Sequence, residues 1–188
     1  MHLLFFLSLS PHIVSIHQQD TTFQSTKFIC AGSLITDKYV LTAAHCFYNA
    51  NRSTEYFVRM GSHFLNETNP IEMRIQSIRL HEKYDHHSYM HDIALIELRS
   101  QLNLSMKTIG LICLPPKNIP IYPYEENGMV AGWGRIDENS SVSQILQQVQ
   151  LPIIWTKNKA CQQQIYNGKT QFCAGLDEGG VDACQGDR

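Results

Sequence analysis

Short apolar runs constrain the fold of this 188-residue chain more than any other feature. Runs of about four to eight apolar and β-branched residues recur along it, separated by Gly, Asn, Pro and charged clusters. No long stretch has helical periodicity, so the pattern predicts an all-β fold. The expected strands are residues 13–16, 28–35, 39–43, 56–60, 72–80, 92–98, 128–133 and 149–154, and the one modest helix candidate is 156–166.

The sequence patterns of two of these strands predict different degrees of burial. Residues 92–98 are almost continuously apolar, which is typical of a strand covered on both faces. In contrast, Met73 and Ile75 alternate with Arg74 and Gln76, which predicts one face toward solvent.

The stretch Leu41-Thr42-Ala43-Ala44-His45-Cys46 is the strongest chemical signal. It places an imidazole, which titrates near neutral pH, beside a cysteine at the end of an apolar run. Alone, such a pair is more often structural than catalytic. Three further stretches favour catalysis: Cys30-Ala31-Gly32-Ser33-Leu34-Ile35, Asp92-Ile93-Ala94-Leu95-Ile96 and Asp182-Ala183-Cys184-Gln185-Gly186-Asp187. In this order and spacing, from about residue 11 to 187, the motifs resemble the trypsin/chymotrypsin family of serine endopeptidases.

The resemblance implies a fold of two antiparallel β-barrels with the active site in the cleft between them. Residues 12–188 would form the peptidase domain, with 12–115 as a nearly complete first barrel, 116–127 as a linker and 128–188 as a partial second barrel. Residues 1–11 resemble the apolar part of a signal peptide but lack its basic start, so they predict either a signal-like segment or a non-native start.

The resemblance also assigns roles to residues. His45 matches the general base and Asp92 its orienting carboxylate, and the alternative for Asp92 is a residue that caps the start of a strand. Asp182 matches the pocket acid that makes such enzymes prefer Arg or Lys, and the alternative is a solvated loop residue. Gly186 matches an oxyanion-hole donor, and Asp187 the carboxylate that pairs with the amino group freed by zymogen cleavage.

The pattern then breaks at Arg188, which stands where the family has its nucleophilic serine. A guanidinium has no acceptor and cannot attack a carbonyl, so we expect the chain as given to be inactive. The family's Ile-Val-Gly-Gly type start and its basic cleavage site are also not found. Two explanations compete: an enzyme truncated before its serine, or a secreted pseudoprotease that acts as a binding module. We favour truncation because a barrel stopped partway leaves unpaired strand edges.

The six cysteines and four glycosylation sequons, at Asn51, Asn66, Asn103 and Asn139, indicate an oxidising, secretory route. By resemblance, Cys30 pairs with Cys46 and Cys161 with Cys173, which leaves Cys113 and Cys184 unpaired. The net charge of −2 argues against a nucleic-acid partner, and no stretch is long enough to span a membrane. The expected partners are protein or peptide substrates and protease inhibitors.

No cofactor or metal site is predicted. One segment is crowded with possible zinc ligands, namely His81, Asp85, His86, His87 and His91, but the spacing from His81 to Asp85 does not match the helical metalloprotease motif, and the alternative is a polar surface loop. Glu72 lies where some members of the family bind calcium, yet Ser62 stands where a carboxylate would be expected. The sequence leaves calcium binding open.

Overall fold

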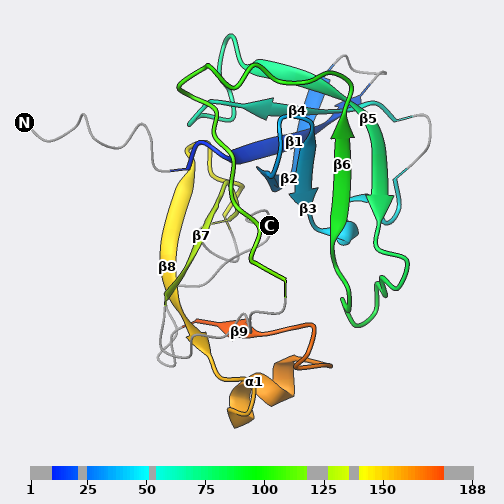
Figure 1. Ribbon diagram of the computed structural model, residues 1–188, viewed down its shortest axis with the longest axis vertical. Helices are drawn as coiled ribbons and strands as arrows, with labels where there is room; N and C mark the ends of the chain where they lie inside the picture. The colour runs from blue at the N-terminus through cyan, green and yellow to red at the C-terminus, as the bar shows by residue number, and fades with distance from the viewer. Residues whose placement is uncertain (1–9, 21–24, 51–53, 118–126, 136–139, 176–188) are drawn as a thin grey trace, which may run out of the picture.

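The structure, a computed structural model, describes residues 10–20, 25–50, 54–117, 127–135 and 140–175. Figure 1 shows strands β1 to β6 gathered in one body, with β7, β8, β9 and α1 extending away from it. The described part is almost entirely strand and loop, which confirms the all-β prediction. No helix within it is both long enough and apolar enough to cross a membrane.

The first six strands form a closed antiparallel barrel in the order β1-β2-β3-β6-β5-β4. They are β1 (Ile13–Asp20), β2 (Ser25–Leu34), β3 (Tyr39–Thr42), β4 (Tyr56–Met60), β5 (Ile71–Leu80) and β6 (Ala94–Leu98). Its interior is packed with fully buried aliphatic side chains, among them Val14, Ile16, Leu34, Val40 and Ile96. This burial of apolar surface is the main force that stabilises the barrel.

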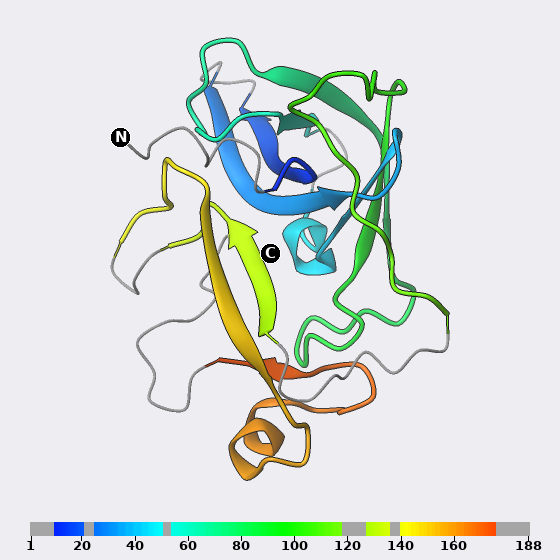
Figure 2. The ribbon, with the colours of Figure 1, turned by 60° about the vertical axis from the view of Figure 1, so that its left-hand side comes forward.

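The second body is a three-stranded antiparallel sheet in the order β7-β8-β9. Its strands are β7 (Asn127–Gly132), β8 (Gln147–Ile154) and β9 (Cys173–Ala174), and the helix α1 (Lys159–Gln164) lies between the last two. Asn158 starts the helix because its side chain accepts a 2.8 Å bond from the Ala160 N–H. The helix is therefore shorter than the expected 156–166. Figure 2 shows β7 and β8 lying side by side below the barrel.

Strand boundaries differ from the sequence prediction where backbone pairing extends past the apolar residues. β1 and β2 continue as a polar hairpin in which Gln18 pairs with Lys27 and Gln19 with Thr26. Ladder hydrogen bonds come from the backbone, so polar side chains on the outside do not end them. β9 is only two residues long and carried no signal in the sequence.

The two predictions of strand surroundings have different outcomes. β5 alternates half-buried and exposed residues from Ile71 to Gln76, which confirms its one exposed face. The prediction that residues 92–98 are covered on both faces is wrong. The strand begins at Ala94 and alternates fully buried residues with the half-buried Leu95 and Glu97, because a strand in a closed barrel has only one face toward the interior.

A loop between β4 and β5 joins the barrel to the second sheet. The Leu65 N–H donates to the Gln144 carbonyl at 3.0 Å, and the Leu146 N–H donates to the His63 carbonyl at 2.8 Å. The buried Trp133 indole adds a 3.2 Å bond to the same His63 carbonyl and packs with Ile13 and Leu65. These contacts hold the second sheet against the barrel.

One ionisable side chain, His17 on β1, is buried against the rings of Phe28 and Phe57. It is 2% exposed, stacks on the Phe57 ring at 5.3 Å between centroids, and its Nε2 lies 2.9 Å from the Ser15 hydroxyl. Its Nδ1 has no hydrogen-bond partner among the described residues. Burial, and to a smaller extent the nearby charge of Arg59, lowers the pKa of His17 to about 4. The imidazole is therefore neutral in the folded protein at neutral pH.

His17 should make the barrel sensitive to acid. Between pH 6.5 and about 4 the unfolded chain binds a proton at His17 that the folded chain does not, so stability falls as pH falls through this window. At pH 4.5 the loss from this residue is about 2 to 3 kcal/mol. Urea unfolding at pH 7 and 4.5 should show a clearly smaller pH effect in His17→Phe. The exposed His87→Gln is the control; an equal pH effect in wild type and His17→Phe would contradict the prediction.

Both disulfides that the resemblance implied are formed, Cys30–Cys46 within the barrel and Cys161–Cys173 between α1 and β9. Cys113 is an exposed free thiol, and Cys184 lies outside the described residues. Thiol titration of the denatured, unreduced protein should therefore find two reactive cysteines. A titration that finds none would mean that Cys113 and Cys184 pair with each other or with a second chain.

Candidate active site

His45 lies on the short 3₁₀ helix η1 (Ala44–Phe47), which directly follows β3. Two contacts fix this turn to β2. The buried Thr42 hydroxyl donates to the Ala31 carbonyl at 2.8 Å, and Cys46 is bonded to Cys30. The turn thus has no freedom to move away from the barrel wall, and His45 is held at its edge.

Barrel topology brings Asp92 to the same edge. β3 and β6 are neighbours, and Thr42 at the end of β3 pairs with Ala94 at the start of β6. Because the strands are antiparallel, the residue two positions before Ala94 and the turn after Thr42 leave the sheet at the same end. Asp92 and His45 therefore meet although they are 47 residues apart in the sequence.

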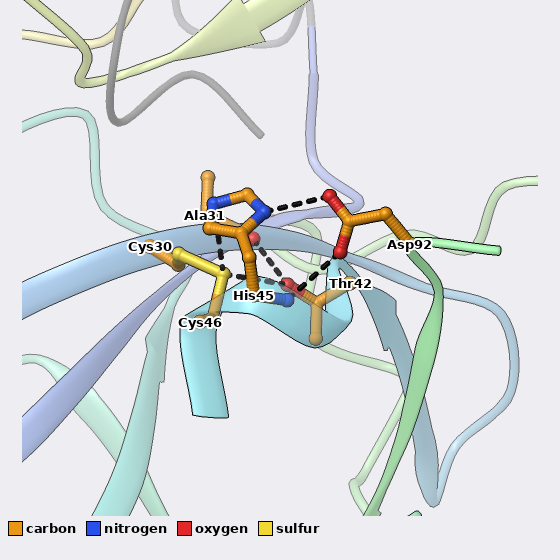
Figure 3. The surroundings of a disulfide bond; sticks show 6 residues. All are labelled: Cys30, Ala31, Thr42, His45, Cys46 and Asp92. Atoms are coloured by element: carbon orange, nitrogen blue, oxygen red, sulfur yellow. Dashed lines mark hydrogen bonds and ion pairs between the residues drawn. A yellow bond between two sulfur atoms is a disulfide. The ribbon is translucent and has the colours of Figure 1, made fainter. Parts of the chain in front are cut away.

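The Asp92 carboxylate makes two hydrogen bonds to His45 (Figure 3). Oδ2 lies 2.7 Å from the ring Nδ1, and Oδ1 accepts the backbone N–H of His45 at 2.8 Å. An ionised carboxylate only accepts hydrogen bonds, so this contact favours the tautomer with the proton on Nδ1. The Nε2 lone pair is then free to accept a proton. The carboxylate both orients the ring and stabilises the turn that carries it.

The same contacts set the charge of Asp92. Burial alone would raise its pKa, but hydrogen bonds from the His45 ring and from the His45 and Ala44 backbone outweigh burial and lower the pKa below its ordinary value. The side chains of His45 and Asp92 are 30% and 13% exposed. The site therefore holds a fixed negative charge behind an imidazole that substrates can reach.

Tyr89 is a neighbour of His45 that sequence reasoning missed. Its ring lies 6.0 Å from the His45 ring in an edge-to-face arrangement and is half exposed. Tyr89 and His91 both have positive φ, at 52° and 54°, and such strain in residues other than glycine costs of order 1 kcal/mol each. The only signal in the sequence was the position of Tyr89 three residues before Asp92.

An open cleft of about 920 Å³ lies between the barrel and the second sheet. Asp92, Leu41 and Ile93 line it from the barrel, and Met129 and Lys169 line it from the other side. The Gln171 side chain also donates to the Ser88 carbonyl at 3.3 Å, which ties the loop before Asp92 to the second body. The orienting carboxylate therefore lies on a cleft shared by both parts of the molecule.

The histidine-rich loop does not gather metal ligands. His81 and His91 stack at 4.7 Å between centroids, and the His81 Nδ1 already accepts a hydrogen bond from the Lys83 N–H. Among the described residues, the one group of three His, Cys, Asp or Glu side chains with mutually close ligand atoms is Cys30, His45 and Cys46. Its two sulfurs are joined in the disulfide.

The side chains at the possible calcium position already have partners within the protein. The Ser62 hydroxyl donates to the Phe64 carbonyl at 2.7 Å and lies 3.1 Å from a Glu67 carboxylate oxygen. Glu72 is paired with Arg59 at 3.1 Å. A calcium ion here would need about six or more oxygen ligands, some of them from backbone carbonyls or water.

The structure describes some of the other residues predicted from the sequence and not the rest. Asn66 and Asn103 are exposed; the Asn66 amide donates to Gln144 at 2.6 Å, and the Asn103 side-chain oxygen accepts the Ser105 N–H at 3.1 Å. The residues outside the described part of the chain are Asn51, Asn139, Asp182, Cys184, Gly186, Asp187 and Arg188.

Comparison with known proteins matches this arrangement to a family. The family model described as Trypsin matches residues 8–188. Serine protease snk of Drosophila melanogaster is 35% identical over 194 residues, which cover 95% of this chain and 42% of that protein. The proclotting enzyme of Tachypleus tridentatus is 34% identical over 84% of this chain and 45% of its own length, and mouse ovochymase-2 is 34% identical over 87% and 28%.

This chain thus spans less than half the length of each of these three relatives. The match nevertheless covers nearly all of the chain, and the closed barrel with its second antiparallel sheet fits the fold that the family model implies. The chain belongs to the trypsin family of serine proteases.

Proposed function

We propose that this domain is a serine endopeptidase domain in which His45 is the general base and Asp92 its orienting partner. The observation that carries the proposal is the two-point contact of one partly buried carboxylate with the ring and the backbone of His45. A hydroxyl is a weak nucleophile at neutral pH, so acyl transfer needs a base held at a fixed position. The Cys30–Cys46 disulfide and the hydrogen bond from Thr42 to the Ala31 carbonyl hold η1 against β2, which supports this role.

In the proposed mechanism, the His45 Nε2 takes the proton of an attacking serine hydroxyl and later gives it to the leaving amine. The Asp92 charge stabilises the imidazolium that forms between these steps. Because hydrogen bonds lower the pKa of Asp92, the carboxylate stays ionised when the imidazole is protonated.

The substrate preference follows from the motif near residue 182. Asp182 matches the acid at the base of the primary specificity pocket, where only a cation satisfies a buried carboxylate. We therefore propose cleavage after Arg or Lys. Gly186 would donate to the oxyanion, and Asp187 would pair with an activated amino terminus. These roles depend on the sequence motif and on membership of the family.

We also propose an extracellular setting and protein or peptide substrates, with protease inhibitors as further partners. Two formed disulfides support an oxidising compartment, and the exposed sequons at Asn66 and Asn103 are accessible to glycosylation.

Residue 188 favours a second candidate for the polypeptide as given. Arg188 occupies the position of the nucleophile and cannot attack a carbonyl. The second candidate is therefore a secreted, non-catalytic binding module. The sequence of the mature transcript separates the two candidates: a stop codon directly after Arg188 in a chain that is secreted folded would favour the binding module.

The protein of residues 1–188 should not hydrolyse an arginine ester above the buffer rate. An active-site phosphonate should also fail to label it, because phosphonates react with an activated serine hydroxyl that the motif lacks. Mass spectrometry of the treated protein checks the second point. Stoichiometric labelling would mean that a different serine serves as the nucleophile.

If the transcript encodes a serine in the motif, Asp92→Asn in that protein should lower kcat by about 10⁴-fold, the loss known for this change in the family's reference triad. The amide cannot hold His45 in the required tautomer. Asp85→Asn is the matched control, since Asp85 bonds Ser88 and His87 in the same loop and touches neither His45 nor Asp92. Equal losses in both variants would contradict the role of Asp92.

A further inference from the structure

The glycosylation sequon at Asn66 has an exposed aromatic ring beside it. Residues 64–68 read Phe-Leu-Asn-Glu-Thr, so Phe64 stands two positions before the acceptor asparagine and Thr68 two positions after it. Phe64 is 50% exposed, and Asn66 and Thr68 are exposed too. The other three sequons have no aromatic residue at the position two before the asparagine, where the sequence has Asn49, Gln101 and Asp137. This feature distinguishes Asn66 from the other three acceptors.

The loop between β4 and β5 holds both side chains on its solvent side. Leu65, which lies between them, is 5% exposed and packs in one apolar cluster with Trp133. The Ser62 hydroxyl accepts the Phe64 N–H at 3.0 Å and donates to the Phe64 carbonyl at 2.7 Å, which fixes the backbone before the turn at residues 65 and 66. With Leu65 buried and both of its neighbours exposed, Phe64 and Asn66 lie on the outer side of the same turn.

We propose that the first N-acetylglucosamine attached to Asn66 packs on the ring of Phe64 and that this contact stabilises the β4–β5 loop. The proposal rests on the secretory setting proposed above, because the sugar is attached there. A pyranose ring has a face made largely of C–H groups, and the negative face of an aromatic ring attracts their partial positive charge. Contact between the two apolar faces also removes both from water.

The attachment chemistry is compatible with the contacts of Asn66. An oligosaccharide linked to a lipid diphosphate is transferred to the Asn66 Nδ2; the bond from the sugar C1 to the diphosphate oxygen breaks, the C1–N bond forms and the amide loses one proton. In the folded protein this nitrogen donates to the Gln144 side-chain oxygen at 2.6 Å. An amide nitrogen has two hydrogens that point in different directions, so one still bonds Gln144 while the sugar leaves away from it.

The sugar contact acts at the junction between the barrel and the second sheet. Phe64 pairs with Ile145 in an isolated antiparallel bridge, and Ile145 is 45% exposed. The next residue, Leu65, donates its N–H to the Gln144 carbonyl at 3.0 Å. A sugar on the Phe64 ring covers exposed apolar surface at this bridge and restrains the loop on both sides of Leu65. We therefore expect the glycan to stabilise the docking of the second sheet on the barrel.

A cycle of four proteins tests the proposal by thermal unfolding. The full chain is secreted with a supplied signal peptide from cells that make high-mannose glycans, and an endoglycosidase trims each glycan to its first sugar. Thr68→Ala removes the sequon but leaves Asn66 and Phe64 in place. It should lower the Tm by about 2 to 4 °C when Phe64 is present, and by less than half as much in Phe64→Ala.

Three controls separate the sugar contact from other effects of the substitutions. In protein refolded from bacteria, which carries no glycan, Thr68→Ala should change the Tm equally with and without Phe64. Ser105→Ala removes the sequon of Asn103, which lacks the preceding aromatic residue, and its effect should also be independent of Phe64. Phe64→Leu keeps an apolar side chain without the ring, so it should behave like Phe64→Ala even if the alanine variant folds poorly.

Nuclear Overhauser contacts between the sugar protons and the Phe64 ring provide a direct readout in the protein without substitutions. They should be present when the first sugar remains on Asn66. Lack of a glycan on Asn66 in the secreted protein, an equal effect of Thr68→Ala with and without Phe64, or absence of the Overhauser contacts would each overturn the proposal. The supplied signal peptide makes this test independent of the extracellular setting, which secretion of the chain with its own start tests separately.

Discussion

The contact between Asp92 and His45 is the constraint on which the rest of the structure depends. One carboxylate bonds the ring and the backbone of the same residue, so the ring orientation and the turn geometry are fixed together. The pairing of β3 with β6 brings the two residues together, because it sets the separation between the turn after Thr42 and the residues before Ala94. The barrel thus provides rigidity for chemistry that requires a base at a fixed place.

Of the two interpretations of Asp92, orienting acid and cap at the start of a strand, the contacts with His45 favour the first. The carboxylate bonds the ring and the backbone N–H of His45, on the turn across the barrel edge. One oxygen of Asp92 bonds the His45 ring and the other bonds the His45 backbone N–H. Together these bonds outweigh burial and lower the pKa of Asp92. His17 presents the opposite balance. Its Nδ1 has no hydrogen-bond partner in the part of the chain that the structure describes, and burial lowers its pKa to about 4, so it is neutral at neutral pH.

The surroundings of η1 fix the position of the candidate base. Thr42, the disulfide and Asp92 hold the turn from three directions. The Nε2 of His45 lies 3.8 Å from the Cys46 sulfur, and the His45 side chain is 30% exposed. The tautomer that Asp92 favours leaves the Nε2 lone pair free to accept a proton, as the proposed mechanism requires.

The sequence by itself determined the all-β class, most strands of the barrel and the residues of the candidate base and its partner, because alternating apolar residues and short motifs are local signals. It misplaced the ends of β1 and β6 and gave no sign of β9, since backbone pairing depends on neighbouring strands. Only the tertiary structure decided that Tyr89 lies against His45, that His17 is buried, and that the His45 Nε2 lies 3.8 Å from the Cys46 sulfur. These are contacts between segments distant in sequence or side-chain directions set by a turn, which no local pattern of residues encodes.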